Sequence, residues 1–152
     1  MMQLEHLMDY HLDLGDALDV GAGPYGKRLI VETVGGSFCG ERFAGRIRAG
    51  GGADWLTMCD DFAHMDVRAT LETHDGALVY AQYTGRSELA PSTLAALAGT
   101  GETEYGENEM FTSWSFQTGD ARYRWLNNLV CVGEGRLRPG RVEYRVYAVR
   151  NG

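Results

Sequence analysis

Apolar and polar residues alternate along much of the chain, and glycines separate the alternating segments at short intervals. The clearest case is the segment 63–72, in which Ala, Met, Val, Ala and Leu alternate with His, Asp, Arg, Thr and Glu. A period of two residues is that of a β-strand with two different faces. Similar reasoning predicts strands at about 3–14, 27–34, 37–48, 53–59, 63–73, 76–86, 109–118, 128–137 and 141–149.

Turn residues predict how some of these strands are joined. Asp75-Gly76 follows the alternating segment, and an apolar run resumes at 77–83. An Asp-Gly pair between two such runs is typical of a tight β-hairpin. Pro139-Gly140 occupies the same kind of position between the last two predicted strands. We therefore predict two hairpins, one in the middle of the chain and one at its end.

Helical patterns are confined to two short stretches. The segment 90–99 has a proline near its start, alanines and leucines in its middle and a glycine at its end, which predicts a helix. The segment 120–126 predicts a single helical turn capped by Asp120. We find no repeat and no linker, so residues 1–152 are expected to form one all-β domain. Because closure removes exposed edges, we predict a closed antiparallel β-barrel of eight to nine strands, lipocalin-like or allene-oxide-cyclase-like in shape, with one short helix.

Composition and charge exclude several classes of partner. The net charge is −7, and the arginines are dispersed rather than gathered in a basic run, so we expect no nucleic-acid partner. No apolar run approaches the roughly 20 residues that span a bilayer, so we expect no membrane partner. The N-terminus has no basic region typical of a signal peptide. The three cysteines are odd in number and form no CxxC pair, which indicates reduced thiols and a cytoplasmic protein.

Neither a cofactor nor a metal is predicted. The clusters Gly35-Gly36 and Gly50-Gly51-Gly52 lack the strand-before, helix-after context of a phosphate-binding loop, and we interpret them as turn and bulge residues. None of the histidines has metal-ligand spacing with a third ligand: they are His6, His11, His64 and His74. A site assembled from distant strands with Asp54 or Asp66 is the less favoured alternative.

The polar face of the segment 63–72 has two interpretations. It is either the solvated outer face of the sheet, with the apolar residues in the core, or the inner wall of a barrel cavity. Asp66 and Arg68 are two residues apart, so both point the same way, roughly 7 Å from each other. Inside a cavity, a carboxylate and a guanidinium would form an acid–base and anion-stabilising pair.

Tyrosines and tryptophans are the second indication of a pocket. Buried Tyr and Trp side chains usually need a partner for their OH or NH groups, so a pocket lined by them would suit an aromatic or polyketide-like ligand. Ordinary core and interface packing accounts for about half of them. They are Tyr10, Tyr25, Trp55, Tyr80, Tyr83, Tyr105, Trp114, Tyr123, Trp125, Tyr144 and Tyr147.

Several ordered motifs together resemble one known family. They are Gly35-Gly36-Ser37-Phe38-Cys39-Gly40, Gly51-Gly52-Ala53-Asp54-Trp55, Asp66-Val67-Arg68-Ala69-Thr70-Leu71, Asp75-Gly76-Ala77-Leu78-Val79-Tyr80, the run Phe116 to Asn127, and Gly133. Over nearly its whole length the chain resembles the domain-of-unknown-function family 3237, small bacterial and fungal β-barrel proteins. Two departures are Gln117, where the pattern usually has Glu, and Cys39, at a variable polar position. The resemblance implies a compact antiparallel barrel that is often a homo-oligomer, with no generally assigned chemistry.

The resemblance favours the cavity interpretation, because its pattern carries Asp66 and Arg68 together with Trp55 and Asn127. We predict a cofactor-independent enzyme of isomerase, cyclase or lyase type, acting by acid–base chemistry on a small, largely apolar or aromatic organic substrate. Asp66 would be the general acid or base, and Arg68 would stabilise negative charge. The predicted proton donor is Tyr80 or Tyr123, and the predicted substrate-binding residues are Asp54, Trp55, Tyr123, Trp125 and Asn127.

Three alternatives remain open from the sequence. The first is a barrel that binds a small organic ligand without turnover. The second is an oligomeric structural subunit in which Asp66 and Arg68 form a structural ion pair. The third is a metal-dependent hydrolase. In each case we expect a homo-oligomer, a dimer or higher.

Overall fold

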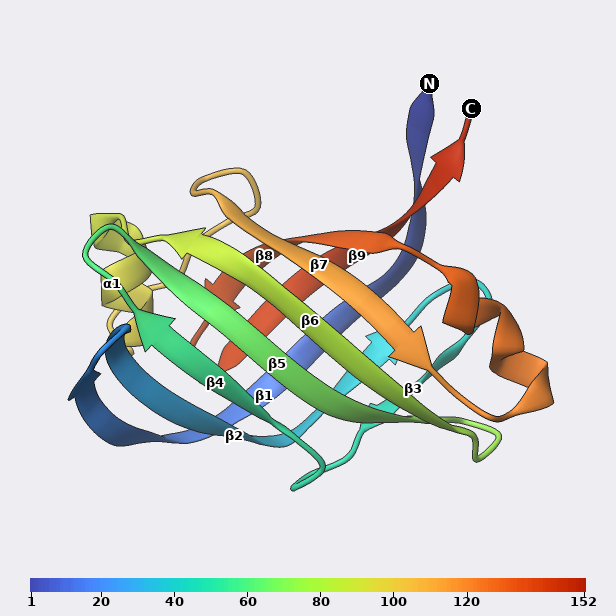
Figure 1. Ribbon diagram of the computed structural model, residues 1–152, viewed down its shortest axis with the longest axis horizontal. Coiled ribbons are helices and arrows are strands. Elements are labelled where there is room, and N and C mark those ends of the chain that lie inside the picture. The colour runs from blue at the N-terminus through green and yellow to red at the C-terminus, as the bar shows by residue number, and fades with distance from the viewer.

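Nine antiparallel strands close into a ring in the computed structural model, which describes residues 1–152 (Figure 1). The strands are β1 (Met2–Gly23), β2 (Gly26–Cys39), β3 (Ala44–Ile47), β4 (Ala53–Met58), β5 (Phe62–Thr73), β6 (Leu78–Glu88), β7 (Met110–Gln117), β8 (Cys131–Arg138) and β9 (Arg141–Asn151). Their order is β1-β9-β8-β7-β6-β5-β3-β2-β4, and the further pairings β1–β2 and β4–β5 close the sheet. The predicted closed antiparallel barrel is confirmed.

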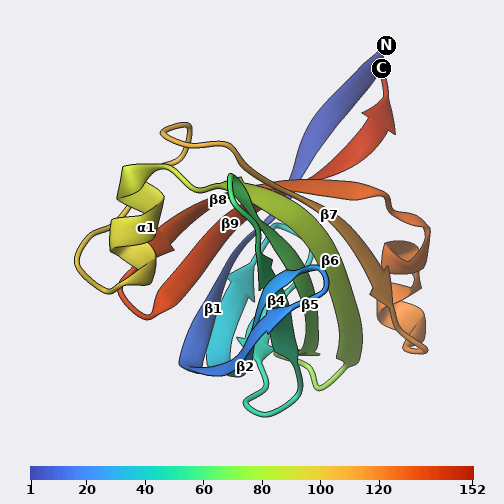
Figure 2. The ribbon, with the colours of Figure 1, turned by 60° about the vertical axis from the view of Figure 1, so that its left-hand side comes forward.

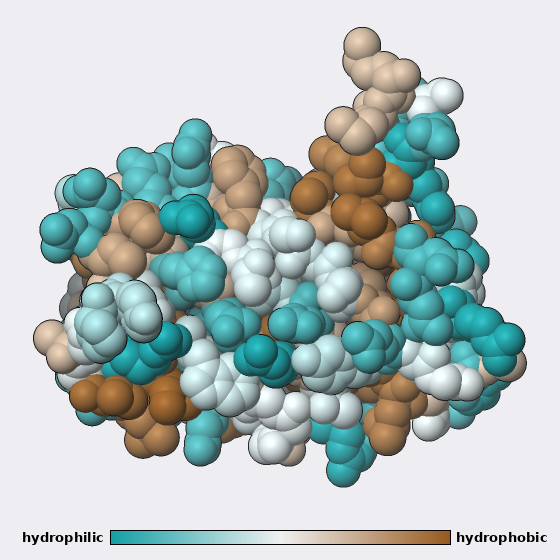
Figure 3. Space-filling view, in the orientation of Figure 1, coloured by the Kyte–Doolittle hydropathy of each residue, from teal (hydrophilic) through white to brown (hydrophobic).

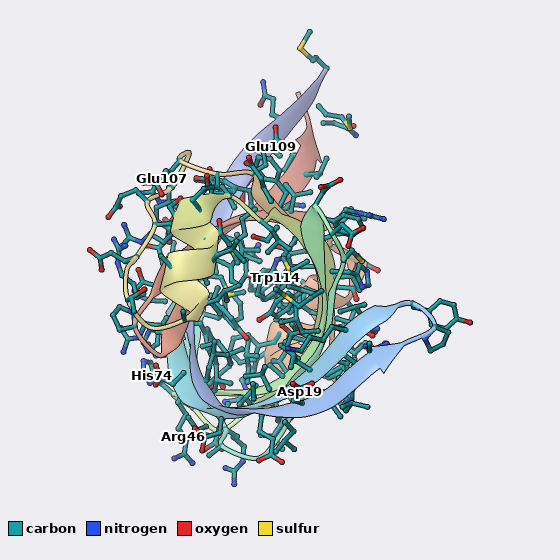
Figure 4. The ribbon with its side chains drawn as sticks, turned by 90° about the vertical axis from the view of Figure 1, so that its left-hand side faces the viewer. Asp19, Arg46, His74, Glu107, Glu109 and Trp114 are labelled. Carbon is teal, nitrogen blue, oxygen red and sulfur yellow. The ribbon has the colours of Figure 1, made fainter.

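Two short helices lie at opposite ends of this barrel (Figure 1). The α-helix α1 (Pro91–Leu97) begins at a proline, as the sequence predicts, and crosses one side of the near opening in Figure 4. The 3-10 helix η1 (Ala121–Asn128) is capped by Asp120, whose carboxylate accepts a hydrogen bond from the Arg122 amide at 2.9 Å. The helical turn predicted at 120–126 is therefore present.

Both predicted hairpins are confirmed, but the N-terminal strands differ from the prediction. β1 continues to Gly23, and β2 runs unbroken through Gly35 and Gly36, where the sequence predicts a turn. These glycines have φ of +144° and +143°, values that residues with a side chain rarely adopt. A Cβ atom at Gly36 would overlap the His11 carbonyl oxygen of β1. The two glycines therefore do not end β2. They allow β1 and β2 to lie close enough together for their pairing to continue.

Aromatic side chains fill the middle of the barrel. Tyr83 and Trp114 stack with ring centroids 3.8 Å apart, and the rings of Tyr10 and Tyr144 pack around them. Trp114 lies inside the ring of strands when the barrel is viewed along its length (Figure 4). Towards η1, Phe43 packs against Trp125 at 5.7 Å. This packing occupies the η1 end, and an interior cavity lies at the end beside α1.

The two chain ends leave the barrel together as a two-stranded arm (Figure 2). Residues Met2 to Glu5 pair with Ala148 to Asn151, while the hydrophobic core begins at Leu7. Neither helix of the structure is long and apolar enough to cross a membrane.

Candidate functional site

A largely apolar cavity of about 80 Å³ lies inside the barrel next to α1. Asp54 is the only charged residue that lines it, and Ser87, Thr93, Tyr83 and Tyr144 are its other polar-tipped residues. The remaining wall is aliphatic and comes from most of the strands and from Leu97 of α1. Such a wall excludes water and strengthens the interactions of the few polar groups inside it.

The strand register turns Asp54 inward. Asp54 pairs with Val31 of β2 on one side and Val67 of β5 on the other, and the buried Val67 belongs to the core. Because side chains alternate along a strand, Asp54 and Leu56 face the cavity while Trp55 faces out. The sequence 53–58 thus places one carboxyl group among aliphatic side chains.

Burial raises the pKa of the Asp54 carboxyl to about 6. The Asp66 amide, which donates a hydrogen bond to Asp54 Oδ1 at 3.1 Å, acts in the opposite direction. The negative charge of Asp66 raises the pKa further, and the positive charge of Arg28 lowers it. A carboxyl with this pKa exchanges its proton close to neutrality, which is what a general acid or base requires.

Phenol hydroxyls are the second chemical feature of the site. The Tyr83 hydroxyl donates to the Tyr10 hydroxyl at 3.4 Å, which leaves the Tyr10 proton free to be donated elsewhere. No protein group hydrogen-bonds to the hydroxyl of Tyr144, which lines the cavity. Burial raises the pKa of Tyr10, Tyr83 and Tyr144, so all three stay neutral and able to donate near neutral pH.

The structure places Asp66 and Arg68 on the outer face of the barrel. On β5 the buried residues are the apolar ones, so the expectation that the polar face lines the interior is wrong. The physical reason is that a barrel of this size fills its interior with side chains, and the apolar face fills it best. The two predicted residues do come together, with Arg68 Nη1 3.5 Å from Asp66 Oδ1, and the Arg68 guanidinium lies 5.0 Å from the centre of the Trp55 ring.

The other predicted site residues lie away from the cavity. Tyr80 is on the outer face of β6, where it shares a shallow surface hollow with Asn127. The Tyr123 hydroxyl donates to the Asp75 carboxylate at 2.9 Å, and the Asn127 side chain bonds both backbone polar groups of Thr118. Trp125 packs at the η1 end of the barrel, with the Arg42 guanidinium 3.6 Å from its ring centre. Of the predicted set, only Asp54 reaches the cavity.

The sequence predicts Asp54 as a substrate-binding residue and not as an acid or base. The available signal was its position two residues before Leu56, which gives a carboxylate an inward-facing place on a strand. Thr93 of α1 and Ser87 of β6 had no such signal, because tertiary packing brings them to the cavity. No three His, Cys, Asp or Glu side chains lie together in a way that could hold a metal ion.

Fold and cavity together define a small closed antiparallel β-barrel protein with an internal, mostly apolar site. Residues 2–149 match the model of a family described as "Protein of unknown function (DUF3237)", and the chain belongs to that family. The resemblance seen in the sequence motifs is thereby confirmed.

Relatives and solved structures agree with this assignment. A UPF0311 protein of Rhodopseudomonas palustris is 28% identical over 137 residues, which cover 90% of this chain and 89% of the relative. A β-barrel-like protein of Acinetobacter baumannii is 33% identical with a TM-score of 0.84, covering 99% of this chain and 97% of that one. A protein described as an enzyme from Penicillium herquei has a TM-score of 0.68 at 20% identity, covering 98% and 95%, and shares the fold.

Proposed function

We propose that this protein is a cofactor-independent acid–base catalyst that acts on a small neutral organic molecule inside the barrel. The observation that carries the proposal is the single carboxyl group, Asp54, in an otherwise uncharged cavity, with its pKa raised to about 6. A carboxylate in apolar surroundings is a stronger base than one in water, because burial penalises its charge.

The proposed chemistry begins with proton transfer from carbon. Ionised Asp54 takes a proton from a carbon next to a carbonyl group, and the C–H electron pair moves to give an enolate. The hydroxyl of Tyr144, which has no protein partner, donates a hydrogen bond to the enolate oxygen. In a substrate whose enolate is conjugated with a C=C bond, return of the proton from Asp54 to the far carbon of the dienolate gives an isomer. In a substrate with a leaving group on the next carbon, the enolate expels that group, which takes the proton from Asp54, and a lyase product results. Attack of the enolate carbon on a second carbonyl carbon of the same molecule gives a cyclised product, and the new alkoxide takes the proton from Asp54.

Cavity size restricts the substrate in the described conformation. A volume of about 80 Å³ is below the roughly 150 Å³ of a cavity that holds benzene. A ketone as small as acetone fits, whereas an aromatic or polyketide-like substrate requires the α1 end to open. We expect this opening to involve a movement of α1, because Thr93 and Leu97 of this helix form part of the cavity wall.

The test is exchange of the methyl protons of acetone for deuterium, followed by NMR in deuterated buffer across a pH series. The wild-type protein should accelerate exchange, with the rate rising through a midpoint near the Asp54 pKa of about 6. Asp54→Asn should remove about 100-fold or more of the acceleration, and Tyr144→Phe should lower the plateau without moving the midpoint.

Asp60→Asn provides the matched control, because Asp60 is an exposed carboxylate at the turn between β4 and β5. It should behave as the wild type does. Equal exchange by the wild type and Asp54→Asn would contradict the proposal. A barrel that only binds ligands, the alternative from the sequence, would show acetone-induced chemical shift changes in both proteins and no accelerated exchange.

A further inference from the structure

The backbone pairing between β4 and β5 is interrupted next to Asp54. The β4–β5 ladder pairs Asp54 with Val67 and then resumes only at Thr57 with His64. Within this gap the Asp66 amide donates to the side chain of Asp54, at 3.1 Å, in place of a backbone carbonyl on β4. The carboxyl of Asp54 is thus part of the wall as well as of the cavity.

Asp66 brings a second carboxyl group to the outer side of the same gap. Its Oδ1 is the one buried side-chain polar atom of the protein that lacks a hydrogen-bond partner. The nearest cation, Arg68 Nη1, lies 3.5 Å away on the outer face and makes no hydrogen bond with it. A buried carboxylate oxygen without a donor is unusual in native proteins and leaves its charge incompletely compensated.

The charged and titratable groups around Asp54 are few. Arg28 of β2, whose guanidinium donates to the Trp55 carbonyl at 2.9 Å, is the positive group that acts on it directly. Asp66 and Arg68 lie beyond the gap on β5. Tyr83 of β6 and Tyr144 of β9 face Asp54 from inside and stay neutral. Asp66 is therefore the only other negative charge facing it, so changes at Asp66 and Arg68 should act on Asp54 through charge.

We propose that Asp66 is the positioning residue of the site. Its backbone amide holds the Asp54 carboxyl in the barrel wall, and its own carboxylate, on the outer face, disfavours a negative charge on Asp54. Arg68 moderates this effect by partly compensating Asp66. This inference rests on the proposed function of Asp54, since positioning a base matters only where the base is used. It gives the outer-face pair a role in the chemistry without contact with substrate.

Two substitutions test the proposal because they act in opposite directions. Asp66→Asn keeps the backbone hydrogen bond and removes the negative charge, so the Asp54 pKa should fall by about half a unit to one unit. Arg68→Gln leaves Asp66 uncompensated, so the Asp54 pKa should rise. The direct measurement is an NMR titration of the side-chain carboxyl carbons, with the Asp54 signal assigned from Asp54→Asn.

Glu72→Gln is the control, because Glu72 is a carboxylate on the same face of β5 that pairs with Arg46 and Arg48 instead. It should leave the Asp54 titration unchanged. An Asp54 midpoint that does not move in Asp66→Asn would overturn the proposal, as would a shift in the same direction in both variants, which would indicate a merely structural role. The titration does not depend on turnover. If the protein did not accelerate acetone exchange, the proposed function would be contradicted, but the titration would still test the proposal for Asp66.

Discussion

The Asp54 carboxyl is held in surroundings that oppose its charge, and this has a consequence for stability. In the unfolded chain its pKa is near 3.8, and in the folded protein it is about 6. Between these values the folded protein holds a proton that the unfolded chain has lost. Stability that depends on this group is therefore full below pH 4, falls as the pH rises to about 6, and is constant above.

We expect Asp54→Asn to stabilise the protein at neutral pH. Asparagine keeps the oxygen that accepts from the Asp66 amide and removes the buried charge, so the free energy of unfolding at pH 7.5 should rise by about 2–3 kcal/mol. At pH 4 the two proteins should be equally stable. Urea unfolding at both pH values measures this difference. A variant that is less stable than the wild type at pH 7.5 would show that the carboxylate is well solvated or paired.

The sequence predicts Asp66 as the acid or base, whereas the carboxylate that lines the cavity is Asp54. Alternation along β5 shows that Asp66 and Arg68 share a face, and they do. It does not show which face is inside, because that depends on how tightly the closed ring is filled. The sequence alone does not identify Asp54 as the carboxylate inside the barrel, since its inward position follows from its pairing with β2 and β5 and from the gap in the wall.

At the scale of elements, α1 is attached to the barrel by apolar packing of Ala96 and by the hydrogen bonds of one side chain. Asn108, in the loop before β7, donates to the hydroxyls of Ser92 at 2.8 Å and Thr93 at 3.0 Å. This seven-residue helix has no side-chain cap, so the Asn108 amide supplies the side-chain hydrogen bonds that hold its first turn. We therefore expect the helix to loosen when these hydrogen bonds are lost.

We expect Asn108→Ala to free α1 without unfolding the barrel. Loss of two partly buried hydrogen bonds should cost about 1–3 kcal/mol locally, so amide hydrogen exchange should quicken in 91–97 and stay slow in β5 and β6. If α1 covers the mouth, the variant should also admit ketones larger than acetone. Asn127→Ala, which loosens η1 at the other end, is the control for access. Unchanged exchange in 91–97 would contradict this view of α1.

Elements with strong local signals were predicted well. The hairpins at Gly76 and Gly140 have positive φ at the predicted turn glycines, and β5 has the predicted alternation. The continuous β2 was not predicted, because Gly35-Gly36 reads as a turn unless the close approach of β1 is known. The local pattern thus identifies strands, but long-range pairing decides whether a glycine lies within a strand or at its end.

At the scale of the whole molecule, closure of the ring pairs most strand edges, but the arm and the part of β1 beyond Asp13 keep free ones. In the arm, Met2 and Leu4 are 75% and 60% exposed, on a two-stranded ribbon. Hydrophobic surface gathers where the arm leaves the barrel (Figure 3), and Leu4 lines a groove there with Phe111 and Val132. Exposed apolar side chains on unpaired strand edges are typical association surfaces.

The homo-oligomer expected from the sequence is therefore predicted to assemble through the arm, with a second copy covering these residues. Leu4→Asp should shift the protein towards monomer in sedimentation velocity at micromolar concentration, with an unchanged melting temperature for the barrel, since Leu4 lies outside the core. Val20→Asp is the matched control: Val20 is 65% exposed, on the distant β1–β2 hairpin, and its substitution should leave association as it is. A wild-type protein that sediments as a monomer would refute the prediction, and equal dissociation by both variants would place the interface elsewhere.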